Sequence, residues 1–184
     1  MEILKQHYNI ISSLLFVFLI IIAHFYSTHN YNWSRNTISD LGSQGYERGF
    51  MMQLGFLIFG LTLSIGILLN GLTWRTAPLF IYGLSVGLTG IFSTKPFFDV
   101  QVYSVFQDSL HSLFAKIAGV TFSIGILIQM FYTDNHAIKW IHFMFFILIL
   151  ALSASFGLLK NQQGIVQRIL YLVSIIWLIK FYKP

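Results

Sequence analysis

Six long apolar runs constrain this chain more than any other feature of its sequence. They cover about residues 8–26, 50–69, 77–92, 113–132, 140–159 and 165–182. A helix needs about 20 mostly apolar residues to cross the hydrocarbon core of a bilayer. Backbone groups in that core must pair internally, and the alternation typical of a closed barrel is not visible. The sequence therefore predicts an all-α polytopic membrane protein, a single domain built as a bundle of six transmembrane helices.

The composition excludes the common soluble classes. Only 9% of the 184 residues are charged and the mean hydropathy is +0.73, whereas soluble domains carry roughly 25% charged residues. The net charge of +5 comes from basic residues scattered between apolar runs, where they anchor helix ends. We therefore expect contact with membrane lipid and no nucleic-acid partner, and protein partners stay open. No small-residue cleavage site follows the first run, so we expect it to be a retained span.

The lengths of the connections sort the polar residues between the two membrane faces. Residues 27–49 and 93–112 form long polar loops, and 70–76 and 133–139 are tight turns. Because successive spans alternate in direction, both long loops lie on one face and both termini on the other. Basic residues do not decide the orientation, since the two faces carry similar numbers of them. The long loops hold most acidic residues, so we expect a multi-pass protein of the cell membrane with cytoplasmic termini.

Candidate chemical groups gather on the long-loop face. Asp108 and His111 have an i, i+3 spacing, which places a carboxylate and an imidazole on one side of a helix. With Ser39 and Asp40 they are candidate acid/base groups. With His24 and Asp99, Asp108 and His111 are also candidate ligands of a divalent metal such as zinc. The alternative is that Asp108 and His111 cap and solvate a helix start. Neither haem nor a nucleotide is expected, because no pair of facing histidines and no nucleotide-binding motif is evident.

Arg168 interrupts the last apolar run. The uninterrupted stretch from Ile169 to Ile179 would span about 16 Å at 1.5 Å per residue, roughly half of the hydrocarbon thickness. Arg168 therefore lies at or inside the membrane boundary, where its side chain either extends to the interface or needs a counter-charge. We predict a structural ion pair that ties the last span to a long loop, with Asp40, Asp99 or Asp108 as the partner.

Three apolar patterns carry predictions about packing. Gly83 and Gly87 form a small-xxx-small pattern, which predicts close approach of a neighbouring helix. The segment that begins at Gly60 is similar to the one that begins at Gly119, which indicates either a duplicated helix pair or chance similarity. The tryptophans lie near span ends and are expected in interfacial belts, at Trp33, Trp74, Trp140 and Trp177.

Several motifs together resemble the domain-of-unknown-function 998 family of six-span prokaryotic membrane proteins. They are Asn36-Thr37-Ile38-Ser39-Asp40-Leu41-Gly42 after the first span, Gly90-Ile91-Phe92 with Asp99 and His111 around the third and fourth spans, and Gly164-Ile165-Val166-Gln167-Arg168 at the last span. Ile165 stands where leucine is usual, and the segment from Phe92 to Asp99 is longer than in the family. The resemblance covers nearly the whole chain and implies the fold and a membrane location. It implies no activity.

Three functions are compatible with these features. The first is a non-catalytic accessory or regulatory protein of the cell envelope, which the absence of a decisive catalytic motif favours. The second is a membrane-embedded, metal-dependent enzyme that modifies lipid at the long-loop face. The third is a small-solute transporter, although transporters usually place polar groups near the midplane and spans two to five lack central charges.

Overall fold

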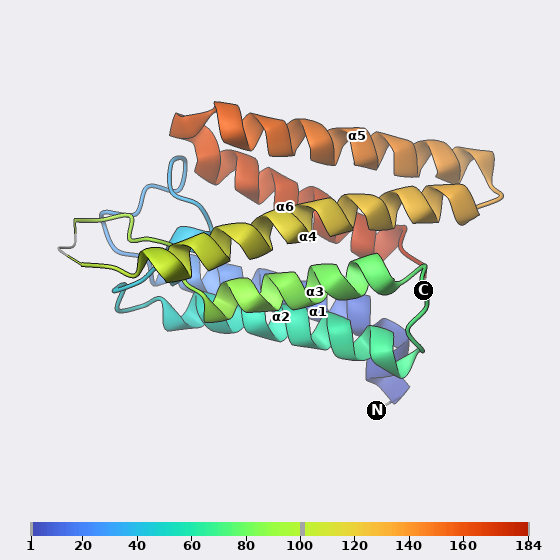
Figure 1. Cartoon of the computed structure of the whole chain (residues 1–184), viewed down its shortest axis with the longest axis horizontal. Coiled ribbons are helices and arrows are strands. Elements are labelled where there is room, and N and C mark those ends of the chain that lie inside the picture. Colours follow the sequence, from blue (N-terminus) through green and yellow to red (C-terminus); the bar gives the residue numbers. More distant parts are fainter. Residues whose placement is uncertain (1, 100–101, 184) are drawn as a thin grey trace.

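The computed structural model describes residues 2–99 and 102–183, and six α-helices dominate it (Figure 1). They are α1 (Glu2–Phe25), α2 (Phe50–Leu69), α3 (Ala77–Ile91), α4 (Val105–Tyr132), α5 (His136–Leu158) and α6 (Gln163–Lys180). Two short 3-10 helices, η1 (Ser39–Gly42) and η2 (Lys160–Gln162), lie in the loops. No strand occurs among the described residues, so the predicted all-α class is confirmed.

Five helices are long and apolar enough to cross a membrane, and α3 is the shorter one. Its 15 residues reach about 22 Å at 1.5 Å per residue. Figure 1 shows all six helices side by side, with both long loops at one end and both described chain ends at the other. We call these the loop end and the terminal end. The chain thus has the form of a multi-pass membrane protein, with the two long loops together as expected.

Two helices begin earlier than the apolar runs indicate. α4 begins at Val105, not near residue 113, because the Ser104 side chain accepts the Gln107 N–H and caps the helix. The second long loop is correspondingly shorter, and Asp108 and His111 lie on the first turns of α4. α1 begins at Glu2, and non-helical angles at His7 (φ −128°, ψ 21°) separate its polar first turns from the apolar span.

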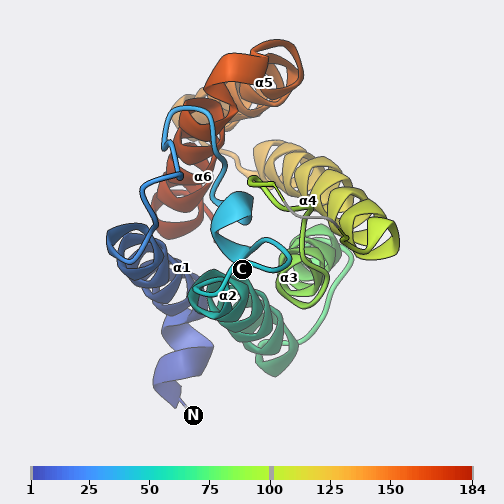
Figure 2. The ribbon, with the colours of Figure 1, turned by 90° about the vertical axis from the view of Figure 1, so that its left-hand side faces the viewer.

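Consecutive helices pack beside one another, and α6 closes the ring against α1. Figure 2 shows this ring from the loop end, with α5 outermost. A series of contacting aromatic rings crosses the interior from α1 to α6. Ring centroids are 4.9 Å apart for Phe16–Phe59, 5.8 Å for Phe59–Tyr82, 4.8 Å for Tyr82–Phe122 and 5.3 Å for Phe122–Trp177. The middle of the bundle is therefore filled with side chains.

Glycine sets the closest helix approach, between α2 and α3. A Cβ on Gly60 would meet the backbone of Gly83 and Gly87, so only hydrogen fits there. This agrees with the close approach that the small-xxx-small pattern of α3 predicts.

The tryptophan prediction is wrong at one position. Trp177 is fully buried, and its indole N–H donates to His142 Nδ1 on α5 at 3.0 Å. Trp33, Trp74 and Trp140 are exposed. Trp177 differs because it lies on the face of α6 that packs against Phe122 and Tyr182. Proximity to a span end does not distinguish an inward face from an outward one.

Candidate functional site

The first loop closes the loop end of the bundle. After α1 it passes over the end of α6 and returns between the helix ends, where it forms η1 (Figure 2). Ile38 and Leu41 anchor this segment, and both are buried. The motif that begins at Asn36 therefore lies over the middle of the ring, in contact with the bundle interior.

Asp40 stabilises the turn that starts η1. Its carboxylate accepts the Thr37 N–H at 2.7 Å, and the Asp40 N–H donates to the Thr37 hydroxyl at 3.1 Å. This reciprocal pair resembles the capping box that closes helix starts. Burial raises the pKa of Asp40 above its ordinary value, because the ionised carboxylate loses hydration. Hydrogen bonds from Thr37 and Asn36 and the nearby His111 oppose the rise.

The residues from Tyr31 to Ser39 bind to the start of α6, and we call this the loop–α6 contact. The Gly164 and Ile165 N–H groups donate to the carbonyls of Arg35 and Ser34, both at 3.2 Å. Gln167 Oε1 accepts the Ile38 N–H at 2.6 Å, and its Nε2 donates to Ser39 Oγ at 3.3 Å. Loop carbonyls thus pair with N–H groups that a helix N-terminus leaves without internal partners.

Arg168 is the charged member of the loop–α6 contact. Its Nη1 donates to the carbonyls of Trp33 (2.7 Å), Asn36 (3.0 Å) and Gly164 (2.8 Å), and its Nη2 donates to the Tyr31 hydroxyl. α6 is therefore joined to the first loop as expected, but through neutral oxygens. Among the described residues no carboxylate, including those of Asp40, Asp99 and Asp108, lies within ion-pair distance of Arg168.

Tyr31 connects Arg168 to the turn around Asp40. Its hydroxyl donates to the Thr37 carbonyl at 2.9 Å while it accepts from Arg168. Burial raises the pKa of Tyr31 to about 12, although Arg168 acts to lower it. The hydroxyl therefore keeps its proton at physiological pH and serves both bonds.

The loop–α6 contact is so close that residue 164 must be glycine. A Cβ there would collide with the carbonyl oxygens of Trp33 and Asn36. Glycine, glutamine and arginine in the segment Gly164–Arg168 thus have one physical purpose: glycine admits the loop, and the two polar side chains bind it.

Asp108 and His111 hold the second long loop and the end of α3. Asp108 Oδ1 accepts the Lys95 N–H at 2.8 Å and the Thr94 hydroxyl at 3.1 Å. His111 Nδ1 lies 2.8 Å from the Phe92 carbonyl and 3.1 Å from the Thr89 carbonyl. Carbonyls only accept, so Nδ1 carries the proton and donates. Neither side chain caps the start of α4, because Ser104 does so. Asp108 instead binds the second loop, and His111 binds the last carbonyls of α3.

The candidate metal ligands do not form one cluster. Within residues 2–99 and 102–183, no three His, Asp or Glu side chains come close enough to hold a metal ion. His24 packs edge-on against Tyr31, with ring centroids 5.6 Å apart, and Asp99 is exposed on the second loop. Asp40 and His111 are near enough for His111 to oppose the rise in the pKa of Asp40. Asp40 is partly buried in the first loop, and His111 is buried on α4.

Two glutamines that the motifs did not single out join the loops. Gln44 donates to the Ser93 and Ser104 carbonyls, both at 3.0 Å, and accepts the Ser104 N–H at 2.8 Å. Gln53 donates to the Gly42 carbonyl at 3.1 Å and to Ser93 Oγ at 3.0 Å. Gln53 could have been predicted to make such a contact, because it is a glutamine inside the apolar run from Phe50 and polar groups inside spans are usually paired.

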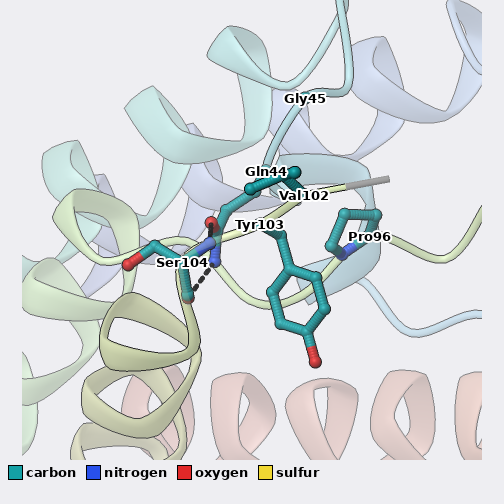
Figure 3. A pocket seen from close by; sticks show the side chains of 6 residues that line it. All are labelled: Gln44, Gly45, Pro96, Val102, Tyr103 and Ser104. Carbon is teal, nitrogen blue, oxygen red and sulfur yellow. Dashed lines mark hydrogen bonds between the residues drawn. The ribbon is translucent and has the colours of Figure 1, made fainter. Parts of the chain in front are cut away.

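An open hollow of about 410 Å³ lies on the outer surface of the loops (Figure 3). Its wall includes Gln44, Ser104, Pro96 and Tyr103, and the hydrogen bond between Gln44 and Ser104 crosses its edge (Figure 3). The hollow is shallow and contains none of the candidate catalytic residues.

The match to known families covers the segments described above. A family described as "Protein of unknown function (DUF998)" matches residues 10–181. The chain belongs to this family. Comparisons with curated proteins and with solved structures give no match. The motifs that carried the DUF998 resemblance coincide with the contacts that hold the loops: the segment from Asn36 to Asp40 meets that from Gly164 to Arg168, and His111 meets the end of α3.

Proposed function

We propose that this DUF998 protein is a non-catalytic accessory or regulatory membrane protein of the cell envelope. The observation that carries the proposal is the use of its polar side chains at the loop end. Asp40, Asp108 and His111 each bind backbone groups, of a turn, of the second loop and of a helix end respectively. A general acid or base must instead reach a proton on its substrate.

The aromatic interior supports this role over solute transport. Phe16, Phe59 and Phe122 are nearly inaccessible to solvent and form part of the ring series that fills the bundle. A transport path needs polar groups around a cavity near the midplane. A metal-dependent lipid-modifying enzyme is the other alternative, and it would need Asp40, Asp108 or His111 to leave its present hydrogen bonds.

A pair of His111 variants tests the proposal. His111→Leu leaves two carbonyls without their donor, which costs about 1–3 kcal/mol for a buried polar group. His111→Asn supplies an amide N–H close to the position of Nδ1, so most of that stability should return. The measurement is the melting temperature in mild detergent. We expect a clear drop for the leucine variant and a much smaller one for the asparagine variant.

A lipid-turnover assay supplies the opposing outcome. Wild-type protein is incubated in vesicles of phosphatidylglycerol and phosphatidylethanolamine with Mg²⁺ or Zn²⁺, and the lipids are followed by mass spectrometry. The accessory role predicts unchanged lipids. Conversion of a lipid by the wild type, lost in both His111 variants, would overturn the proposal in favour of the enzyme.

We also propose that the protein lies in the cell membrane with its terminal end facing the cytoplasm. Asp40, Glu47, Asp99 and Asp108 belong to the loop end, which suits an external surface. Alkaline phosphatase, which is active only outside the cytoplasm, should be inactive when fused to the C-terminus and active when inserted beside Asn30 in the first loop. The reverse pattern would invert the orientation.

A further inference from the structure

A lateral groove of about 170 Å³ lies between α1 and α6, on the outside of the ring. Its lining is almost wholly apolar and includes Val17, Ile20 and Ile21 of α1, Leu172 and Ile175 of α6, and Ile38 of the first loop. Ile21 and Leu172 are 47% and 57% exposed. In a membrane, this groove faces the lipid.

Arg168 is the one cation in the lining of the groove. Its acceptors are three carbonyl oxygens and a tyrosine hydroxyl, which pair its N–H groups but leave its charge uncompensated. A guanidinium has five N–H donors, and the described residues provide no partner for the Nε–H. An uncompensated charge at the edge of the hydrocarbon region is costly, so a counter-charge from outside the chain would stabilise Arg168.

The groove carries its positive charge at the loop end and is apolar toward the bilayer interior. Arg168 lies five residues after the start of α6, about 7.5 Å along the helix, close to the loop end. Leu172 and Ile175 follow it toward the bilayer interior. A cation at the headgroup level above an apolar channel matches an amphiphile with an anionic head and a hydrocarbon chain.

We propose that the α1–α6 groove binds one acyl chain of an anionic membrane phospholipid, with the lipid phosphate at Arg168. Arginine pairs strongly with phosphate oxygens, and the apolar wall of the groove suits an acyl chain. No acidic residue lines the groove, so the ammonium of a zwitterionic lipid finds no partner there. The inference is independent of the accessory role, because none of the candidate catalytic residues lines this groove.

Native mass spectrometry tests the site. The full-length protein in mild detergent receives equimolar phosphatidylglycerol and phosphatidylcholine with the same acyl chains. We expect at least fivefold more phosphatidylglycerol adduct on the wild type. Arg168→Gln should remove this preference. Equal adducts of the two lipids on the wild type would overturn the proposal.

A groove-filling variant locates the lipid without touching Arg168. Leu172→Trp should lower the phosphatidylglycerol adduct at least fivefold. Val120→Trp is the matched control, because Val120 is 60% exposed on α4, outside the groove. Equal adducts on these two variants would place the lipid elsewhere and overturn the proposal. The melting temperature of each variant checks its folding, and if Arg168→Gln does not fold, Leu172→Trp decides.

Inorganic phosphate is the competitor that separates a lipid site from a simple anion site. An excess of it should leave the phosphatidylglycerol adduct unchanged, because the apolar wall holds the acyl chain. Displacement of the lipid by phosphate alone would show that the groove contributes no affinity, which contradicts the proposal.

Discussion

Asp40 shows how one residue serves the fold at a cost in electrostatic energy. Its carboxylate accepts the Thr37 N–H, and in that position Asp40 is partly buried. Burial raises the pKa of Asp40 in spite of its hydrogen bonds. The folded protein therefore holds this proton more tightly than the unfolded chain does.

This pKa shift predicts how stability depends on pH. The contribution of Asp40 is full below the ordinary carboxyl pKa of about 4 and is lost as the pH rises through the raised pKa of the folded state. The melting temperature of the wild type in detergent should fall over that window relative to Asp40→Asn, which stays neutral and keeps an acceptor for Thr37. Asp134→Asn, at an exposed position, is the control. If the wild type and Asp40→Asn had parallel pH profiles, Asp40 would not hold an extra proton in the fold.

The sequence identified which residues make polar contacts at the loop end, but it did not identify what each of them contacts. Asp40, Asp108, His111 and Arg168 all lie at the loop end in structural contacts. Residue type and spacing did not reveal that backbone groups, rather than each other, are their partners. Loop conformation determines which carbonyls face a side chain, and the sequence carries no simple signal for it.

At the level of helices, α2 and α4 repeat one arrangement. They carry the similar segments that begin at Gly60 and Gly119, and each receives a side chain from the preceding helix at the equivalent glycine. Gly66 packs against Tyr8 of α1, and Gly125 packs against Leu79 of α3. The two helices therefore correspond at this second glycine, whereas the surroundings of Gly60 and Gly119 differ.

The same comparison supplies a matched test of helix packing. A methyl group on Gly60 would lie about 2.6 Å from the Gly87 Cα, whereas nothing lies within 4 Å of the equivalent position on Gly119. Gly60→Ala should cost about 1–3 kcal/mol through overpacking. Gly119→Ala should be neutral or stabilise by up to about 1 kcal/mol through helix propensity. Equal melting temperatures for the two variants would contradict the close α2–α3 approach.

Helix number and direction were predictable, since apolar length and parity determine them. The residues at which the helices begin were less predictable. The first two turns of α4 contain Gln107, Asp108 and His111, and their polarity hid a helix that Ser104 caps. The sequence also did not show which side of each helix packs inward, as Trp177 illustrates. A span that is apolar all round has no distinct polar face.

For the whole molecule, the loop–α6 contact closes the ring where α6 meets α1. A ring of consecutive helices has one junction between the first and the last, and the first loop reinforces it with the hydrogen bonds of Gly164, Gln167 and Arg168. The proposed lipid groove lies along this same junction. Loss of the contact should therefore loosen the loop end without abolishing helix formation.

A double-mutant cycle between Tyr31 and Arg168 tests this claim most directly. The free energy of unfolding is measured in mixed micelles for Tyr31→Phe, Arg168→Gln and the double variant. Side chains in one hydrogen-bond network should show a coupling of about 0.5–3 kcal/mol. Tyr103→Phe, on the outer hollow of the loops, should be additive with Arg168→Gln to within about 0.5 kcal/mol. Additivity of Tyr31→Phe with Arg168→Gln would contradict the account.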